Sequence, residues 1–254
     1  MEPVQNLVNT DYESVPLPWS QPAPFAIFPY KPLFPNLLTR VDQVRSSGFY
    51  GFFNADLLAS QAADFIRSNS DADQELLVQV MRQFLNLAKQ DCLAGATTKN
   101  VQVVHSCWLD IRMTLPIPSR VVPRWHTDGR MFDCKCPTKI PHSKYAFTIM
   151  GPSTRIIAPN PAATEILEKG SPTGRRWDQN QPDPELAETL ARYEEVAIRL
   201  GQIIRFSWNQ PDSPIHSEPD SSGLCRVFVS VLFGSEEELR DMCDFRGEKY
   251  NYWN

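Results

Sequence analysis

Long apolar runs are missing from this 254-residue sequence. A helix that crosses a membrane needs about 20 mostly apolar residues, and no stretch reaches about 18, so we expect no membrane partner. The N-terminal stretch lacks the basic start and apolar centre of a secretory signal, which favours a cytoplasmic protein. Positive charge is not in surplus, because 25 Lys and Arg against 30 Asp and Glu give a net charge of −5. A nucleic-acid partner is therefore not expected.

Cysteine and histidine are both scarce, with six and four residues. The cysteines are scattered, and without a secretion signal free thiols are the default expectation. Cys134 and Cys136 follow His126 closely, which raises the alternative of a thiolate metal site. A Cys-x-Cys pair without a second cysteine pair is a poor zinc signature, so this alternative is the weaker one. Nothing in the sequence indicates the oligomeric state.

Hydrophobic residues make up 42% of the chain and charged residues 22%, which is typical of a globular protein with a sizeable core. We expect one domain over residues 1–254. Its parts are a proline- and aromatic-rich arm (1–38), a helical brace (39–100), a β-rich core (101–234) with an insertion (159–200), and a C-terminal helix and tail (235–254).

Hydrophobic spacing predicts helices over 55–68, with Asn54 as the cap, and over 73–91. From residue 101 the period changes to two, with bulky residues on both faces, and this places His105 in the core. Short helical stretches in the insertion suggest a lid. The pattern favours a β-rich α+β fold, a double-stranded β-helix (jelly roll, cupin-like) braced by N-terminal helices. Further strands are expected around 122–128, 145–150, 154–158, 202–208, 213–217 and 224–233.

The sequence His126-Thr127-Asp128 is the main candidate for chemistry. Residues i and i+2 of a strand point to the same face, so both side chains can bind one metal ion. Two imidazoles and one carboxylate are the ligands that hold non-haem Fe(II) with open coordination positions. We take His216 as the third ligand, over His105 in the core and His142 in a loop. The alternative for Asp128-Gly129 is a surface turn.

Arg226 stands inside an apolar strand and is the second candidate. A buried guanidinium needs an anionic partner, and its planar fork suits a carboxylate. Ser230 lies on the same face of that strand, with Phe228 between them. A structural ion pair with an Asp or Glu is the alternative reading of Arg226.

The segments RWHTDG, SPIHSEP and LCRVFVSVLFG, in this order, resemble the Fe(II)/2-oxoglutarate-dependent oxygenases, in particular small members from fungal specialised metabolism. The resemblance spans about residues 100–235. It implies Fe(II) on His126, Asp128 and His216, with the far carboxylate of 2-oxoglutarate on Arg226, ten residues after His216, and Ser230 nearby. Dioxygen would be the co-substrate, and an unactivated C–H bond of a small molecule would be hydroxylated, desaturated or closed into a ring.

Other polar residues on or beside the expected strands are candidates for binding substrate or cosubstrate, namely Arg155, Arg112, Arg124 and Thr148. The surplus of arginines extends the hypothesis to an amino-acid-like substrate. Two alternatives stay open: a mononuclear iron enzyme that needs no ketoacid, and a non-catalytic jelly-roll binding module.

Overall fold

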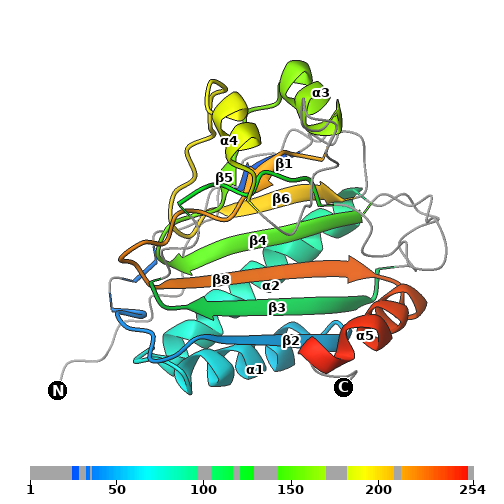
Figure 1. The fold of residues 1–254 in the computed structure, drawn as a ribbon. Coiled ribbons are helices and arrows are strands. Elements are labelled where there is room, and N and C mark those ends of the chain that lie inside the picture. Colours follow the sequence, from blue (N-terminus) through cyan, green and yellow to red (C-terminus); the bar gives the residue numbers. More distant parts are fainter. Residues whose placement is uncertain are drawn as a thin grey trace.

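The computed structural model (Figure 1) describes residues 25–28, 33–34, 36–95, 104–116, 121–128, 142–169, 182–208 and 213–250. Most of the expected arm (1–38) lies outside these residues, as do Cys134 and Cys136. In the described part, no helix has both the length and the apolar character needed to cross a membrane.

A six-stranded antiparallel sheet forms the centre of the described structure, in the order β1-β6-β4-β8-β3-β2 (Figure 1). Its strands are β1 (Phe25–Phe28), β2 (Arg45–Phe52), β3 (Ser106–Thr114), β4 (His142–Met150), β6 (Ile203–Trp208) and β8 (Arg226–Gly234). Alternation along β8 buries Val227, Val229 and Val231 on one face, which leaves Arg226 and Ser230 on the other.

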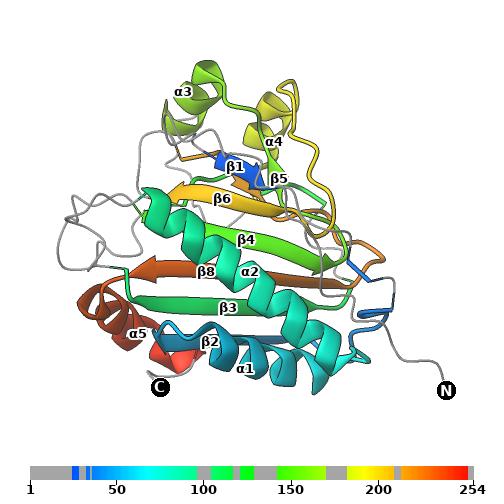
Figure 2. The ribbon, with the colours of Figure 1, turned by 180° about the vertical axis from the view of Figure 1, so that it is seen from behind.

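Helices α1 (Ala55–Arg67) and α2 (Gln74–Gly95) cover one face of this sheet (Figure 2). Both predicted helices are confirmed, and the Asn54 side chain caps α1 by accepting a hydrogen bond from the Leu57 amide at 3.1 Å. Their apolar sides pack in one core with the odd-numbered residues of β3 and β8. Strand β2 was not predicted, because its residues fell within the expected helical brace.

A buried polar group fastens α2 to the sheet. The Tyr145 hydroxyl donates to Asp91 Oδ2 at 2.6 Å, and Arg205 Nη1 lies 3.3 Å from the same oxygen. Burial raises the pKa of the Asp91 carboxyl, and the bonds from Tyr145 and Arg205 oppose that rise. The group ties α2 to β4 and β6 on the helical face.

The other face of the large sheet carries two separate layers. Helix α5 (Glu236–Tyr250) packs on β2 and β3 through Leu239 and Met242, beside the stacked rings of Tyr50 and Trp108. A small sheet holds β5 (Arg155–Ile156) and β7 (His216–Ser217). Isolated bridges add His126 beside His216 and Glu195 beside Ile157.

Helices α3 (Pro161–Lys169) and α4 (Pro184–Leu190) pack on the outer side of the small sheet. Ala163, Leu186 and Leu190 contact a cluster that includes Trp125 and Ile215, which alternate with the histidines. The described parts of the insertion therefore brace the small sheet from outside, whereas a lid was expected from the insertion.

Candidate metal centre

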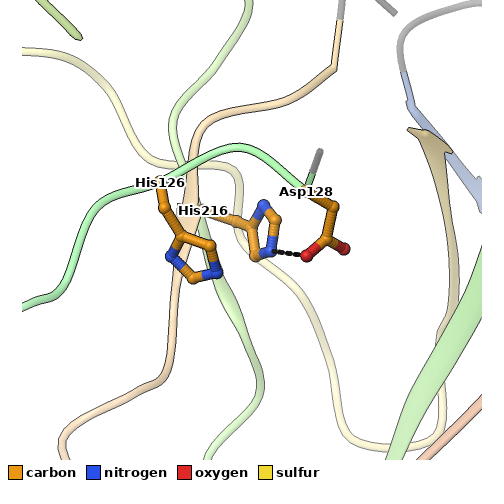
Figure 3. A group of neighbouring side chains, drawn as sticks. All are labelled: His126, Asp128 and His216. Atoms are coloured by element: carbon orange, nitrogen blue, oxygen red, sulfur yellow. Dashed lines mark ion pairs between the residues drawn. The ribbon is translucent and has the colours of Figure 1, made fainter. Parts of the chain in front are cut away.

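Among the described residues, His126, Asp128 and His216 form a group that could hold a metal ion. Their ligand atoms all lie within 4.8 Å of one another. Figure 3 shows the three side chains together, with His216 Nε2 and Asp128 Oδ1 at 3.6 Å. Two imidazole nitrogens and one carboxylate oxygen suit a divalent iron with open positions.

Main-chain pairing brings the two histidines together across 90 residues of sequence. The His126 amide donates to the His216 carbonyl at 3.0 Å, and the His216 amide donates back at 2.9 Å. The neighbours Trp125 and Ile215 are buried under α3 and α4, so alternation turns both imidazoles to the opposite side. The expected strand over 122–128 is thus reduced to a single bridge at His126.

Each imidazole has one nitrogen held by a backbone carbonyl two residues earlier. His126 Nδ1 lies 2.8 Å from the Arg124 carbonyl oxygen, and His216 Nδ1 lies 2.9 Å from that of Pro214. A carbonyl oxygen only accepts, so each Nδ1 carries the hydrogen. The lone pair of each Nε2 is therefore available to a metal ion, which is the usual arrangement of metal-binding histidines.

The electrostatics of the site favour the charge states that bind metal. Burial, together with the charges of His216 and Arg124, lowers the pKa of His126 to about 3. Burial alone would raise the pKa of Asp128, but Lys144 and His216 lower it more, and it ends well below its usual range. At neutral pH His126 is therefore neutral and Asp128 is ionised.

Lys144 of β4 reaches the site from the large sheet. Its ammonium donates to Asp128 Oδ2, while Oδ1 is the oxygen nearer His216. The ammonium lies 4.9 Å from the centre of the Phe206 ring, and the same ring lies 4.8 Å from the His216 ring. One buried aromatic side chain thus supports both a ligand and its neighbouring cation.

An ion pair flanks the two histidines on the small sheet. Arg124 precedes His126 by two residues, and Glu218 follows His216 by two. Their side chains form a two-pronged contact, at 3.2 Å from Nε and 2.5 Å from Nη2. Burial raises the pKa of Glu218, but the bond and charge of Arg124 bring it to about 2. The pair joins the segments that carry the two imidazoles.

Arg226 is buried at the start of β8, and its contacts run to the turn before β5. Its Nε donates to the Pro152 carbonyl at 2.9 Å and its Nη2 to Thr154 Oγ1 at 3.1 Å. The guanidinium lies 4.6 Å from the centre of the Phe228 ring. Ser230 is also buried on this face, but four residues along a strand amount to about 13 Å, so Thr154 is the hydroxyl that contacts Arg226.

The other three arginine candidates each form an ion pair. Arg155 binds Glu195 with two nitrogens, at 2.9 and 2.5 Å, and Arg124 binds Glu218 as described above. Arg112 Nε lies 2.8 Å from Asp110 Oδ2. Thr148 is buried in β4, on the same face as Lys144. These pairs favour structural roles for Arg155 and Arg124.

His105 is not a core residue, and this prediction was wrong. It is exposed just before β3 and stacks on Phe52, with ring centres 5.8 Å apart. The alternation of β3 begins one residue later, at Ser106, so the pattern was extended too far upstream. His142 was expected in a loop and is the first residue of β4.

Two residues of the site escaped sequence reasoning: Lys144 and Glu218. A lysine in alternation with Ala146 and Thr148 on an apolar strand was the available signal for Lys144. The placement of Glu218 two residues after His216, mirroring Arg124 before His126, was a second signal.

No protein-family model and no curated protein sequence matches this chain. Solved structures that match include the dioxygenase for auxin oxidation 1 from Arabidopsis thaliana in its 2-oxoglutarate binary complex (10% identity, TM-score 0.40, 76% of this chain and 64% of that one). The dioxygenase for auxin oxidation in rice matches at 12% identity with a TM-score of 0.38, over 81% of this chain and 62% of that one. A Pseudomonas putida prolyl-4-hydroxylase matches at 13% identity with a TM-score of 0.35, over 75% of this chain and 92% of that one. This chain spans less than two thirds of the first two, and at such distances the function must be argued from the site itself.

Proposed function

We propose that this chain is a non-haem Fe(II)- and 2-oxoglutarate-dependent oxygenase that oxidises an unactivated C–H bond of a small molecule. The convergence of His126, Asp128 and His216 carries the proposal. Both Nδ1 atoms are occupied by carbonyls, so the two Nε2 atoms and Asp128 Oδ1 form the donor set on one side of an ion. With iron and ketoacid bound, the site would supply dioxygen activation, with succinate and CO₂ as co-products.

Arg226 and Thr154 support the ketoacid part of the proposal. The guanidinium is buried, its position is fixed by Pro152 and Thr154, and it lies on the sheet face that looks toward the small sheet. A fixed, planar cation of this kind suits a carboxylate better than a flexible one. We assign the far carboxylate of 2-oxoglutarate to Arg226 with Thr154. Ser230 lies farther away on the same face of β8 and stays a candidate for lining this pocket.

Strand adjacency supports a jelly roll for the single domain of residues 1–254. Counting from β3, with the bridged segments at His126 and Glu195 as strands, eight strands would divide between two sheets. The large sheet would hold the first, eighth, third and sixth, and the small sheet the second, seventh, fourth and fifth. This is the connectivity of two interleaved Greek keys, and it sets the metal ligands against the large sheet.

The test of the proposal is oxygen-dependent succinate release. The parent protein with Fe(II) and 2-oxoglutarate should release succinate in air, slowly without a substrate and faster with one, and Asp128→Ala should release none. An amino-acid-like substrate is a narrower hypothesis, tested by whether free amino acids accelerate this release. Iron-bound protein that oxidises a substrate without consuming ketoacid would favour the ketoacid-independent alternative, and protein that binds no iron would favour the binding module.

A further inference from the structure

Lys144 is a charged residue of the large sheet that contacts a candidate metal ligand, Asp128. It lies near the start of β4, where Phe206 of β6 and Leu232 of β8 are its strand partners. Its side chain is 13% exposed, and its ammonium binds the oxygen of Asp128 that is farther from His216. Two flanking strands and the Phe206 ring hold it there.

We infer that Lys144 is a positioning residue that restricts Asp128 to binding the metal through one carboxylate oxygen. This inference rests on the proposed function, since it assumes a metal ion at the three ligands. A carboxylate can bind an ion with one oxygen or with both. Because Lys144 holds Oδ2, Oδ1 is the oxygen left to face the two imidazoles.

The number of oxygens matters because three protein atoms leave three positions of an octahedral ion open. A chelating ketoacid would take two of them, and dioxygen would need the third. If Asp128 bound with both oxygens, one of these positions would be lost. Lys144 therefore keeps the site open, which is a different task from holding the ion.

This assignment makes an unusual prediction about metal affinity. An ammonium beside a divalent cation opposes metal binding by charge repulsion. Removing it should leave the affinity for metal unchanged or higher, while the affinity for ketoacid falls. A residue needed only for packing would lower both, or neither.

The experiment uses the full chain, stripped of metal and titrated with Co(II) under argon, with the visible absorption recorded. Lys144→Met should bind Co(II) at least as tightly as the parent, and its visible bands should differ from those of the parent because a second Asp128 oxygen replaces a water on the ion. In a second titration with Fe(II) and 2-oxoglutarate, its affinity for ketoacid should fall roughly 10–100-fold, the range by which loss of a ligand's outer partner commonly lowers activity. Lys144→Arg should recover most of the ketoacid affinity.

Lys89→Met is the matched control. Lys89 is a half-buried lysine that also lies near an aromatic ring, 4.9 Å from the centre of Phe233, but it donates to the Val104 carbonyl on the helical side of the sheet. It should behave as the parent in both titrations. If Lys144→Met does not fold, Lys144→Gln, which shortens the side chain and removes the charge, replaces it with the same expected directions.

The outcomes distinguish a failure of the proposed function from a failure of the role inferred for Lys144. A parent protein that binds no Co(II) overturns the proposed function and this inference with it. If the parent binds Co(II) and ketoacid, but the Lys144 variant matches it in spectrum and ketoacid affinity, only the inference is wrong. A folded Lys144 variant that loses Co(II) also contradicts the inference, because Lys144 would then be needed to hold the ion.

Discussion

Hydrogen bonds distinguish His126 and His216 as ligands at the scale of single residues. Both have Nδ1 against a backbone carbonyl and belong to the group of ligand atoms with Asp128. His105, in contrast, is exposed and stacks on Phe52. Spacing alone could not make this distinction. The orientation of each ring depends on a carbonyl two residues earlier, and this follows from the local backbone.

Replacing a ligand should remove the metal without unfolding the protein. His126→Ala, Asp128→Ala and His216→Ala should each weaken divalent metal binding by more than roughly 100-fold, the upper end of the typical loss for an outer partner that supports a ligand. Isothermal titration with Co(II) measures this. His105→Ala is the control, and it should bind metal as the parent does. Full metal occupancy in any ligand variant would remove that residue from the site.

Arg226 should decide the affinity for 2-oxoglutarate and leave the metal alone. Arg226→Lys keeps the charge but removes the fork, so ketoacid binding should weaken by about 1.5–3 kcal/mol, the range for hydrogen bonds to charged groups. Thr154→Val should weaken it less, by loosening the guanidinium. Equilibrium titration of ketoacid against the Co(II) protein gives both values. Parent-like ketoacid affinity in Arg226→Lys would make the residue structural.

At the scale of elements, the turn between β4 and β5 brings Pro152 and Thr154 to Arg226. Gly151 begins this turn with a φ of 83°, and a Cβ there would lie 2.1 Å from the Cys225 carbonyl oxygen. Only glycine allows both this backbone conformation and this close approach. The position of Arg226 therefore depends on a residue that carries no side chain.

Gly151→Ala should destabilise the protein more than Gly223→Ala. Both glycines have positive φ, but a Cβ at Gly223 meets nothing within 4 Å. Backbone strain alone costs about 1–3 kcal/mol, and Gly151→Ala adds the clash to that strain. Urea unfolding of both variants measures the difference, and Gly151→Ala should also lose ketoacid affinity. If the two variants had equal free energies of unfolding, the turn would accommodate the Cβ of Gly151→Ala by a backbone shift that costs no stability.

Lys144 and its neighbour Tyr145 separate function from stability on one strand. Tyr145 points to the helical face and donates to Asp91, on the side of β4 opposite Lys144. Tyr145→Phe removes one donor from a buried carboxylate, so the free energy of unfolding should fall by about 1–3 kcal/mol. Co(II) affinity should not change. A loss of metal binding in this variant would show that the two faces of β4 are not independent.

Sequence patterns predicted the elements better than their contacts. Helices 55–68 and 73–91 follow from the spacing of apolar residues, and the strand with Arg226 follows from alternation, so their positions were correct. Strand β2 was missed because Arg45–Phe52 contains two serines and two glycines and shows little apolar alternation. Contacts between sheets, such as Lys144 with Asp128, depend on packing that no local pattern records.

At the scale of the whole molecule, the site lies between the large and the small sheet, and each sheet contributes different residues to it. The small sheet and the segment bridged to it at His126 supply the three ligands, backed by α3 and α4 through Trp125 and Ile215. The large sheet supplies Lys144 and Arg226, backed by α1 and α2. Each sheet is thus supported on its outer side, and the polar groups face each other across the space between them.

The most direct test of the proposed function is an anaerobic titration of the Fe(II)-loaded protein with 2-oxoglutarate, followed by visible absorption. Chelation of iron by the ketoacid gives a weak charge-transfer band. The parent should develop this band and saturate at one ketoacid per iron, while His216→Ala should give none and Arg226→Lys should need more ketoacid. Iron-loaded parent protein that develops no band at saturating 2-oxoglutarate would contradict the assignment of this chain as a ketoacid-dependent oxygenase.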